Sequence, residues 1–225
     1  MNLKCIGIGA AGNKAGIRLL ERDLMNEEKI MLLNSTMRDI PSEYRSLAIT
    51  YNDTLGGCGK ERDLAKNLSL SALESKRLEK LDSFIDPADD YVVIVTSTEG
   101  GTGSGSSVII AKYLKEVLGV RVMPVGFTGF EEDGRGLQNT IEFFQDLEED
   151  YIVQAISNKK FIEEAMGNKL KAEKLANEEF ANRISILLTE GSLDLLPLLN
   201  LKNMLLNIFL GLNSGLSLYV FSRLL

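Results

Sequence analysis

Short apolar runs alternate along the chain with longer segments in which apolar residues recur at helical spacing. The clearest run is Tyr-Val-Val-Ile-Val-Thr at 91–96, which is uninterrupted and rich in β-branched residues, as in a strand buried on both faces. Further strands are predicted at 3–9, 30–33, 44–50 and 121–125. Helices are predicted at 12–25, 60–84, 105–118, 136–149, 158–166 and 169–188.

This alternation predicts an α/β fold, with a doubly wound, mostly parallel sheet and helices on both of its faces. In such sheets a ligand lies beyond the carboxyl ends of the strands. Glycine-rich segments at 7–12 and 100–105 each follow a predicted strand directly. The pattern therefore predicts that both segments lie at the ligand-binding edge of the sheet, where a phosphate is expected.

The pattern changes near residue 191, so we expect a domain at 1–168, a long central helix at 169–190 and a distinct C-terminal segment at 191–225. Residues 203–222 carry no charge and match the roughly 20 residues that a membrane helix needs. Asparagine, serine and glycine residues interrupt this stretch, however. It is therefore expected to pack on the fold or to begin an incomplete second domain, and not to span a membrane.

Composition excludes several classes of function. The chain has 225 residues, a net charge of −7 and no histidine, and its basic residues are scattered, which argues against a direct nucleic-acid surface. Without histidine, neither a common zinc site nor a Ser-His-Asp triad is available, so no metal site built from side chains is expected. The cysteines, Cys5 and Cys58, are expected to be free thiols of a cytoplasmic protein, because the N-terminus shows no signal-peptide pattern.

The first glycine segment, Gly7-x-Gly9-x-x-Gly12, has the spacing and context of a dinucleotide-binding turn. That interpretation requires an acidic residue at the end of the second strand, to bind the ribose, and Asn34 stands there instead. A binding site for NAD(P) and a tight strand–helix turn without a ligand both remain open on this segment alone.

The second glycine segment is Gly100-Gly101-Thr102-Gly103-Ser104-Gly105. Successive glycines allow consecutive backbone N–H groups to converge on phosphate oxygens at the start of a helix. Thr102 and Ser104 add hydroxyl donors. No lysine follows, so the segment is not a Walker loop.

At this point the sequence resembles the tubulin/FtsZ superfamily, because residues 100–105 are similar to the family's signature Gly-Gly-Gly-Thr-Gly-Ser/Thr-Gly loop. The family's first glycine is replaced by Glu99, whose carboxylate would repel a phosphate unless it turns away or helps to hold Mg²⁺. The resemblance covers about residues 3–190. It implies the family's GTPase fold, with 1–168 as the GTP-binding domain and 191–225 as a partial or degenerate second domain.

The resemblance also implies which residues bind the nucleotide. Thr36 stands in place of the family's usual aspartate, which weakens a water-mediated contact to Mg²⁺. Asn158 and Asn177 match the segment that reads ribose and guanine, and Glu131, Glu132 and Arg135 are candidates in the ribose loop. The phosphate-binding candidates are Gly9, Ala10, Ala11, Gly12, Asn13, Asn34, Gly57, Cys58, Gly59, Gly100, Gly101, Thr102, Gly103, Ser104 and Gly105.

What the resemblance implies about function is a Mg²⁺-dependent, GTP- and GDP-binding cytoskeletal protein that assembles into protofilaments and hydrolyses GTP on assembly. Cell division and plasmid or phage DNA segregation are both compatible with it, with an adaptor protein as a further candidate partner. Family members supply catalytic carboxylates from a loop after the central helix of the next subunit. Asp194 is the candidate here, although one register instead places Pro197 and Asn200 on the family's aspartates. A hydrolysis-deficient nucleotide-binding relative that regulates a filament is therefore the alternative.

Overall fold

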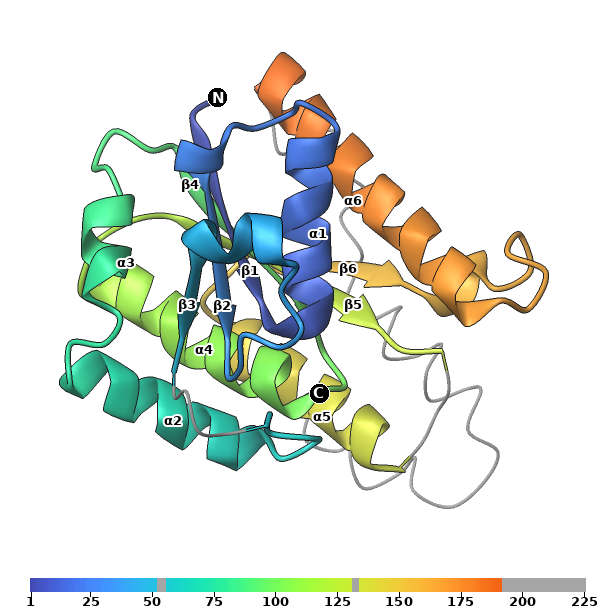
Figure 1. Cartoon of the computed structure of the whole chain (residues 1–225), viewed down its shortest axis with the longest axis horizontal. Coiled ribbons are helices and arrows are strands. Elements are labelled where there is room, and N and C mark those ends of the chain that lie inside the picture. The colour runs from blue at the N-terminus through green and yellow to red at the C-terminus, as the bar shows by residue number, and fades with distance from the viewer. Residues whose placement is uncertain (52–55, 131–133, 192–225) are drawn as a thin grey trace.

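The computed structural model of the chain describes residues 1–51, 56–130 and 134–191. Its centre is a six-stranded parallel sheet in the order β3-β2-β1-β4-β5-β6 (Figure 1). The strands are β1 (Leu3–Ile8), β2 (Ile30–Asn34), β3 (Ala48–Thr50), β4 (Tyr91–Ser97), β5 (Val122–Thr128) and β6 (Gln154–Ser157). The chain reverses its direction of winding between β1 and β4, and a ligand of a doubly wound sheet binds at this kind of switch point.

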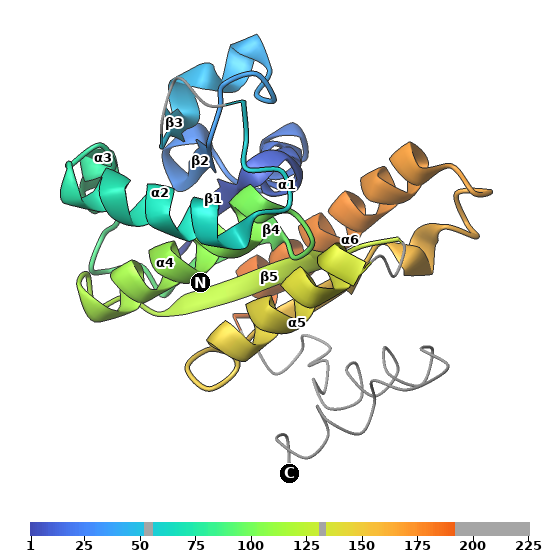
Figure 2. The same ribbon diagram turned by 90° about the horizontal axis from the view of Figure 1, so that it is seen from below.

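Helices cover both faces of this sheet, as the alternation of elements predicted. They are α1 (Gly9–Glu21), α2 (Arg62–Glu74), α3 (Glu79–Phe84), α4 (Gly101–Glu116), α5 (Gly134–Leu147) and α6 (Lys169–Glu190). Short 3₁₀ turns occupy η1 (Glu27–Lys29), η2 (Ser42–Leu47) and η3 (Lys159–Phe161). Helices α1 and α6 lie side by side, and α4 lies between α2 and α5 (Figures 1 and 2).

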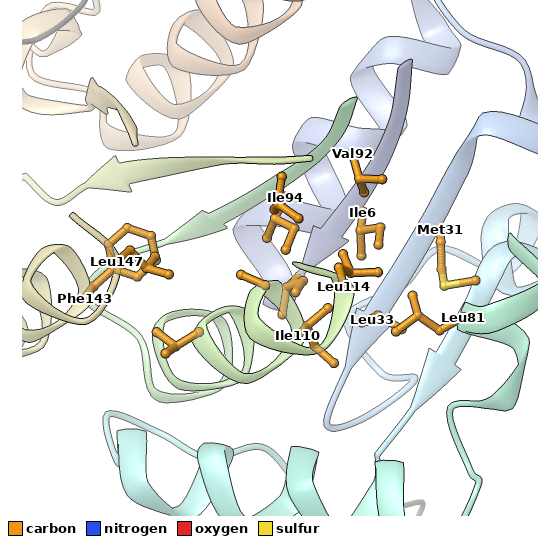
Figure 3. Packing of buried hydrophobic residues seen from close by; sticks show 14 of the residues in the cluster. Ile6, Met31, Leu33, Leu81, Val92, Ile94, Ile110, Leu114, Phe143 and Leu147 are labelled. Carbon is orange, nitrogen blue, oxygen red and sulfur yellow. The ribbon is translucent and has the colours of Figure 1, made fainter. Parts of the chain in front are cut away.

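Each strand sends alternate side chains into two separate hydrophobic cores, because successive side chains of a strand point to opposite faces. In β4, Val93 and Val95 pack with α1 and α6, whereas Val92 and Ile94 pack with α4 and α5. Figure 3 shows the second core, where Ile110 and other residues of α4 lie against the strands. The uninterrupted apolar run at 91–96 thus marks a strand buried on both faces, as predicted.

The central helix α6 is anchored at both ends. The Asn168 side chain accepts a hydrogen bond from the Lys171 N–H at 3.0 Å, and Gly191 ends the helix in the left-handed conformation, with φ of 66°. Its buried side chains, Ala172, Ala176, Phe180, Ala181, Ile184 and Leu187, form one stripe towards the sheet. No helix in the described part of the chain is long and apolar enough to cross a membrane.

Several elements differ from the sequence prediction. The strand predicted at 44–50 is instead the 3₁₀ turn η2 followed by the short strand β3. In place of the helix predicted at 158–166, the chain forms only the 3₁₀ turn η3. The strand before it, β6 at Gln154–Ser157, was not predicted, because four residues are too few to show the alternation of a strand. The helix predicted at 60–84 is two helices, separated by a turn in which Lys76 has φ of 60°. Helix α4 begins at Gly101, so the glycine segment itself forms its first turns.

Candidate functional site

The two glycine segments meet at the carboxyl ends of β1 and β4. Gly9 adopts φ of 74°, and a Cβ there would lie 3.1 Å from the Gly103 nitrogen. A Cβ on Gly12 would lie 2.1 Å from the Val95 carbonyl oxygen, and one on Gly103 would lie 2.2 Å from Thr96 Oγ1. These glycines are required because α1, α4 and the strand ends approach one another at backbone contact distance.

Thr102, in the first turn of α4, connects three loops. Its hydroxyl lies 3.1 Å from the Ser35 hydroxyl, which follows β2. The same hydroxyl oxygen accepts a hydrogen bond from the Cys58 N–H at 3.4 Å. Segments that are far apart in the sequence are therefore joined through one side chain.

A second set of hydrogen bonds holds the segment 56–61 against the glycine loop. The Gly101 N–H donates to the Gly59 carbonyl oxygen at 2.6 Å, so this N–H is already used within the protein. The fully buried Asn139 side chain donates through Nδ2 to the carbonyl oxygens of Lys60, at 3.0 Å, and Glu99, at 2.7 Å. Because α5 carries Asn139, this helix fixes the relative position of the two loops.

These loops enclose a cavity of about 370 Å³, which we call the loop cavity. The first turns of α1 and α4 border it, so the positive ends of two helix dipoles face the cavity. The amide nitrogen of Asn34 is buried there and has no hydrogen-bond partner among the described residues. The cavity is lined by Ile8, Gly9, Ala10, Ala11, Asn34, Ser35, Asp39, Gly56, Gly57, Cys58, Gly59, Ser97, Gly100, Gly101, Thr102 and Gly103.

A second cavity, of about 140 Å³, lies beside α6, and we call it the α6 cavity. It shares Ala11 and Ser97 with the loop cavity, so the two hollows adjoin. Its remaining lining residues are Lys14, Glu99, Phe127, Gly129, Phe130, Asn158, Glu173 and Asn177. The site as a whole is elongated, with a loop-rich end and an end that carries two amides and two aromatic rings.

The two cavities differ in chemistry. Among the described residues, Asp39 is the one ionisable side chain other than Cys58 that lines the loop cavity, where donors from backbone and hydroxyl groups dominate. In the α6 cavity the Lys14 ammonium pairs with the Glu173 carboxylate at 3.1 Å. The loop cavity is thus suited to phosphate groups, and the α6 cavity to a flat polar ring that needs both donors and acceptors.

Glu99 does not line the loop cavity. Its side chain lies against Gly129, where an added Cβ would come within 1.8 Å of the Glu99 Oε1 atom. The carboxylate therefore turns towards the α6 cavity, which removes the repulsion of phosphate that the sequence raised as a concern.

The structure brings most of the residues singled out in the sequence to one of the two cavities. Asn158 and Asn177 come together at the α6 cavity, although they belong to different elements. Asn34 and Thr102 line the loop cavity, as do the glycines at 9, 57, 59, 100, 101 and 103 together with Ala10, Ala11 and Cys58. The site residues Glu131 and Asp194 lie outside the described residues, as does Glu132.

Five other candidates line neither cavity. Gly12 and Gly105 serve close packing, since a Cβ on Gly105 would lie 2.4 Å from the Arg62 carbonyl oxygen. Ser104 is buried, and its hydroxyl donates to the Gly100 carbonyl oxygen. Arg135 pairs with Glu61 at 3.2 Å. Asn13 is 1% exposed, and neither of its amide atoms has a partner among the described residues.

Sequence reasoning passed over several lining residues. Asp39, Ser97 and Lys14 each follow a predicted strand or begin a helix at the ligand-binding edge, which is the signal that could have identified them. Phe127 gave no signal, because the sequence prediction ended its strand at 125, whereas β5 continues to Thr128. Phe130 follows β5 in a loop, where no pattern marks it.

Comparisons with known proteins agree with this arrangement. No protein-family model matches the chain. The cell division protein FtsZ of Mycoplasmopsis pulmonis is 28% identical over 172 residues, which are 72% of this chain and 41% of that protein. This chain thus spans less than half of that relative.

Two solved structures of Haloferax volcanii proteins share the fold. CetZ2, as a GTPγS-bound protofilament, matches with a TM-score of 0.72 and 23% identity over 85% of this chain and 59% of that chain. CetZ1, as a GDP-bound monomer, matches with a TM-score of 0.70 and 23% identity over 83% and 60% of the two chains. The predicted doubly wound α/β fold is confirmed by the sheet and by these structures.

Proposed function

We propose that this chain, which belongs to the tubulin/FtsZ superfamily as a short and divergent member, binds one guanine nucleotide along the two adjoining cavities. Its phosphates occupy the loop cavity and its base occupies the α6 cavity. The observation that carries the proposal is the convergence of the loops after β2 and β3 on Thr102, in the first helical turn after β4, next to a cavity that presents Asn158 and Asn177.

The phosphate end is supported by the donors that the fold leaves available. The first-turn N–H groups of Thr102 and Gly103 have no carbonyl partner within their helix, and Asn34 presents an unpaired amide nitrogen. Backbone donors can hold a polyanion without a lysine. The compared CetZ structures contain GDP and GTPγS, which are the nucleotides that this site is proposed to bind.

The base end is supported by the side chains of the α6 cavity. An amide group both donates and accepts, so Asn158 and Asn177 together match the mixed edge of guanine. Phe127 and Phe130 supply apolar surface beside them for the ring.

Mg²⁺ fits the loop cavity as an ion held mainly by phosphates and water. No group of three or more metal-ligating side chains that could hold a metal exists among the described residues, and Mg²⁺ commonly uses one or two carboxylates plus substrate phosphates. Asp39 is the carboxylate that lines the cavity, whereas the Thr36 hydroxyl accepts from the Arg38 N–H at 3.3 Å. We therefore assign the protein contact to Asp39; bound Mg²⁺ would neutralise charge on the β- and γ-phosphates.

The proposal extends to assembly and turnover. The FtsZ relative is named for cell division, and CetZ2 was solved as a protofilament. By analogy the chain assembles head to tail, in division or in DNA segregation, and Asp194 of one subunit acts on the nucleotide of the next. Because 190–200 holds only Glu190 and Asp194 as carboxylates, a filament-regulating relative that does not hydrolyse GTP is the second candidate.

A binding titration on the full chain tests the nucleotide assignment. GTP and GDP should bind in the presence of Mg²⁺ with at least about tenfold higher affinity than ATP, and NAD should not bind, as measured by isothermal titration calorimetry. Tighter binding of NAD than of GTP would replace the proposal with a dinucleotide site. Concentration-dependent phosphate release separates the hydrolysing form from the hydrolysis-deficient one.

A further inference from the structure

Glu99 contributes a carboxylate to the α6 cavity, two residues after Ser97, where the two cavities adjoin. It precedes Gly100, which lines the loop cavity, and it follows Ser97, which lines both cavities. Its own side chain lines only the α6 cavity. A nucleotide with its phosphates in one cavity and its base in the other must place its sugar at this junction.

A carboxylate there has a specific chemical counterpart in the sugar. The 2′- and 3′-hydroxyls of a ribose present two neighbouring O–H donors, and the two oxygens of an ionised carboxylate accept them in charge-assisted hydrogen bonds. Doubly wound sheets that bind dinucleotides use an acidic residue after their second strand for this contact. In this chain that place holds Asn34, whose Oδ1 instead accepts from the Ser35 N–H at 2.8 Å.

We propose that Glu99 binds the ribose hydroxyls and makes the site selective for ribonucleotides over deoxynucleotides. The proposal rests on the proposed function, because it assumes that a guanine nucleotide occupies the two cavities. The acidic residue that replaces the first glycine of the phosphate loop thereby supplies the sugar contact from the end of β4.

The backbone around Glu99 is held firmly enough for such a contact. Its carbonyl oxygen accepts from Asn139 Nδ2 at 2.7 Å, and Asn139 is fully buried. One residue earlier, the Thr98 hydroxyl lies 2.8 Å from the Thr140 hydroxyl. Both contacts reach α5, so the backbone that carries the carboxylate is fixed before a ligand arrives, and binding costs no ordering of this loop.

The other role open to a carboxylate in this region is contact with Mg²⁺ at the phosphates. Glu99 does not line the loop cavity, and Asp39 does. The two roles give different results when the sugar is varied. If Glu99 contacts the sugar, its contribution to affinity requires the ribose hydroxyls. If it contacts the metal, its contribution requires Mg²⁺ and is the same with or without those hydroxyls.

The experiment compares GTP with 2′,3′-dideoxyGTP on the full chain by isothermal titration calorimetry at fixed Mg²⁺. The unchanged protein should bind GTP about tenfold or more tightly than the dideoxy form, since hydrogen bonds to charged groups are worth this much. In Glu99→Ala the preference should fall by about tenfold, with dideoxyGTP affinity nearly unchanged. 2′-deoxyGTP and 3′-deoxyGTP then show whether one or both hydroxyls are bound.

Glu173→Gln is the matched control, because it removes a carboxylate from the same cavity, near the base end. It should leave the ratio of GTP to dideoxyGTP affinity unchanged. The inference is overturned if Glu99→Ala weakens both nucleotides equally, or if the unchanged protein does not distinguish them. Absence of any guanine-nucleotide binding by the unchanged protein would instead refute the proposed function itself.

Discussion

At the scale of single residues, the site depends on a few side chains whose roles differ by position. Asn177 lies on α6, the helix that closes the base end of the site, and its neighbour Glu178 points elsewhere, to ion pairs with Arg18 and Arg22. Of these two adjacent residues, Asn177 thus faces the cavity in which we propose that the base binds, and Glu178 packs α6 on α1.

Asn177→Ala should lower GTP affinity by about tenfold and reduce the preference for GTP over ATP, because it removes one hydrogen bond to the base. Competition binding with both nucleotides measures this. Glu178→Ala, the matched control, should keep the preference, since its partners lie on α1 outside the cavity. An unchanged GTP-to-ATP ratio in Asn177→Ala would remove Asn177 from base recognition.

Element packing depends on a buried arginine beneath the phosphate loop. Arg62, in the first turn of α2, is 2% exposed and pairs with Glu142 at 2.8 Å and Asp146 at 2.7 Å, both on α5. Its Nη2 also donates to the Ser104 carbonyl oxygen of α4 at 3.4 Å. The Arg62 guanidinium thus joins α2, which follows the segment 56–61, to α4, which begins with the glycine loop, and to α5, which carries Asn139.

The acidic partners titrate in a direction that makes this stabilisation depend on pH. Burial raises the pKa of the Asp146 carboxyl, but hydrogen bonds from Lys66 and Arg62 outweigh it, so the pKa lies below its ordinary value. Burial also raises the pKa of the Glu142 carboxyl, but hydrogen bonds from Gln138 and Arg62 outweigh it, so this pKa too lies below its ordinary value. A lowered folded-state pKa gives stability that is present above the unfolded-state pKa, about 4, and is lost as pH falls through the folded value.

Arg62→Met should therefore reduce the free energy of unfolding by about 2 kcal/mol at pH 7, where the carboxylates keep partial access to water. The difference from the unchanged protein should shrink below about pH 4. Urea unfolding at both pH values measures it. Arg121→Met is the control, since Arg121 is 64% exposed and should change stability by less than about 1 kcal/mol. If Arg62→Met lowers the free energy of unfolding by the same amount at acid pH as at pH 7, Arg62 stabilises the fold through packing and not through its ion pairs.

On the scale of the whole molecule, we propose that a second copy of the chain completes the active site. Among the described residues, Asp39 is the single carboxylate that lines the loop cavity, and we have assigned it to Mg²⁺. Asp194 follows α6, outside the described residues. Phosphoryl transfer needs positioned groups on the attacking side, so turnover is expected to require contact between subunits.

Asp194→Ala should abolish phosphate release and leave the dissociation constant for GTP unchanged. Thr102→Phe, which places a bulky side chain in the loop cavity, should bind no GTP while its circular dichroism stays native. Mixing the two variants should restore turnover, because one supplies an intact pocket and the other an intact Asp194. If the mixture stays inactive and the unchanged protein shows no dependence on concentration, catalysis between subunits is wrong for this chain.

Much of the fold follows from local pattern. The β-branched run at 91–96 and the glycines directly after 3–9 predicted β4, β1 and their following helices, because periodicity and turn chemistry act within a few residues. Where the pattern is short an element was missed, as at β6, for which the sequence predicts no strand. β6 pairs with β5 from Val125 to Thr128, so its formation depends on that neighbouring strand.

For the candidate site, too, some features follow from the sequence and others depend on tertiary packing. Sequence by itself determined the fold class, because the alternation of strand and helix patterns is a matter of residue type and spacing. The phosphate-binding role of the glycine loop and the base-binding role of Asn158 and Asn177, which the family resemblance implies, stay predictions. Only the tertiary structure decided that Gly12 and Gly105 serve packing, that Asp39 lines the loop cavity and that Glu99 turns to the α6 cavity. The direction of a side chain depends on what occupies the space around it, and here that space is filled by segments 30 or more residues away, as Gly129 is from Glu99.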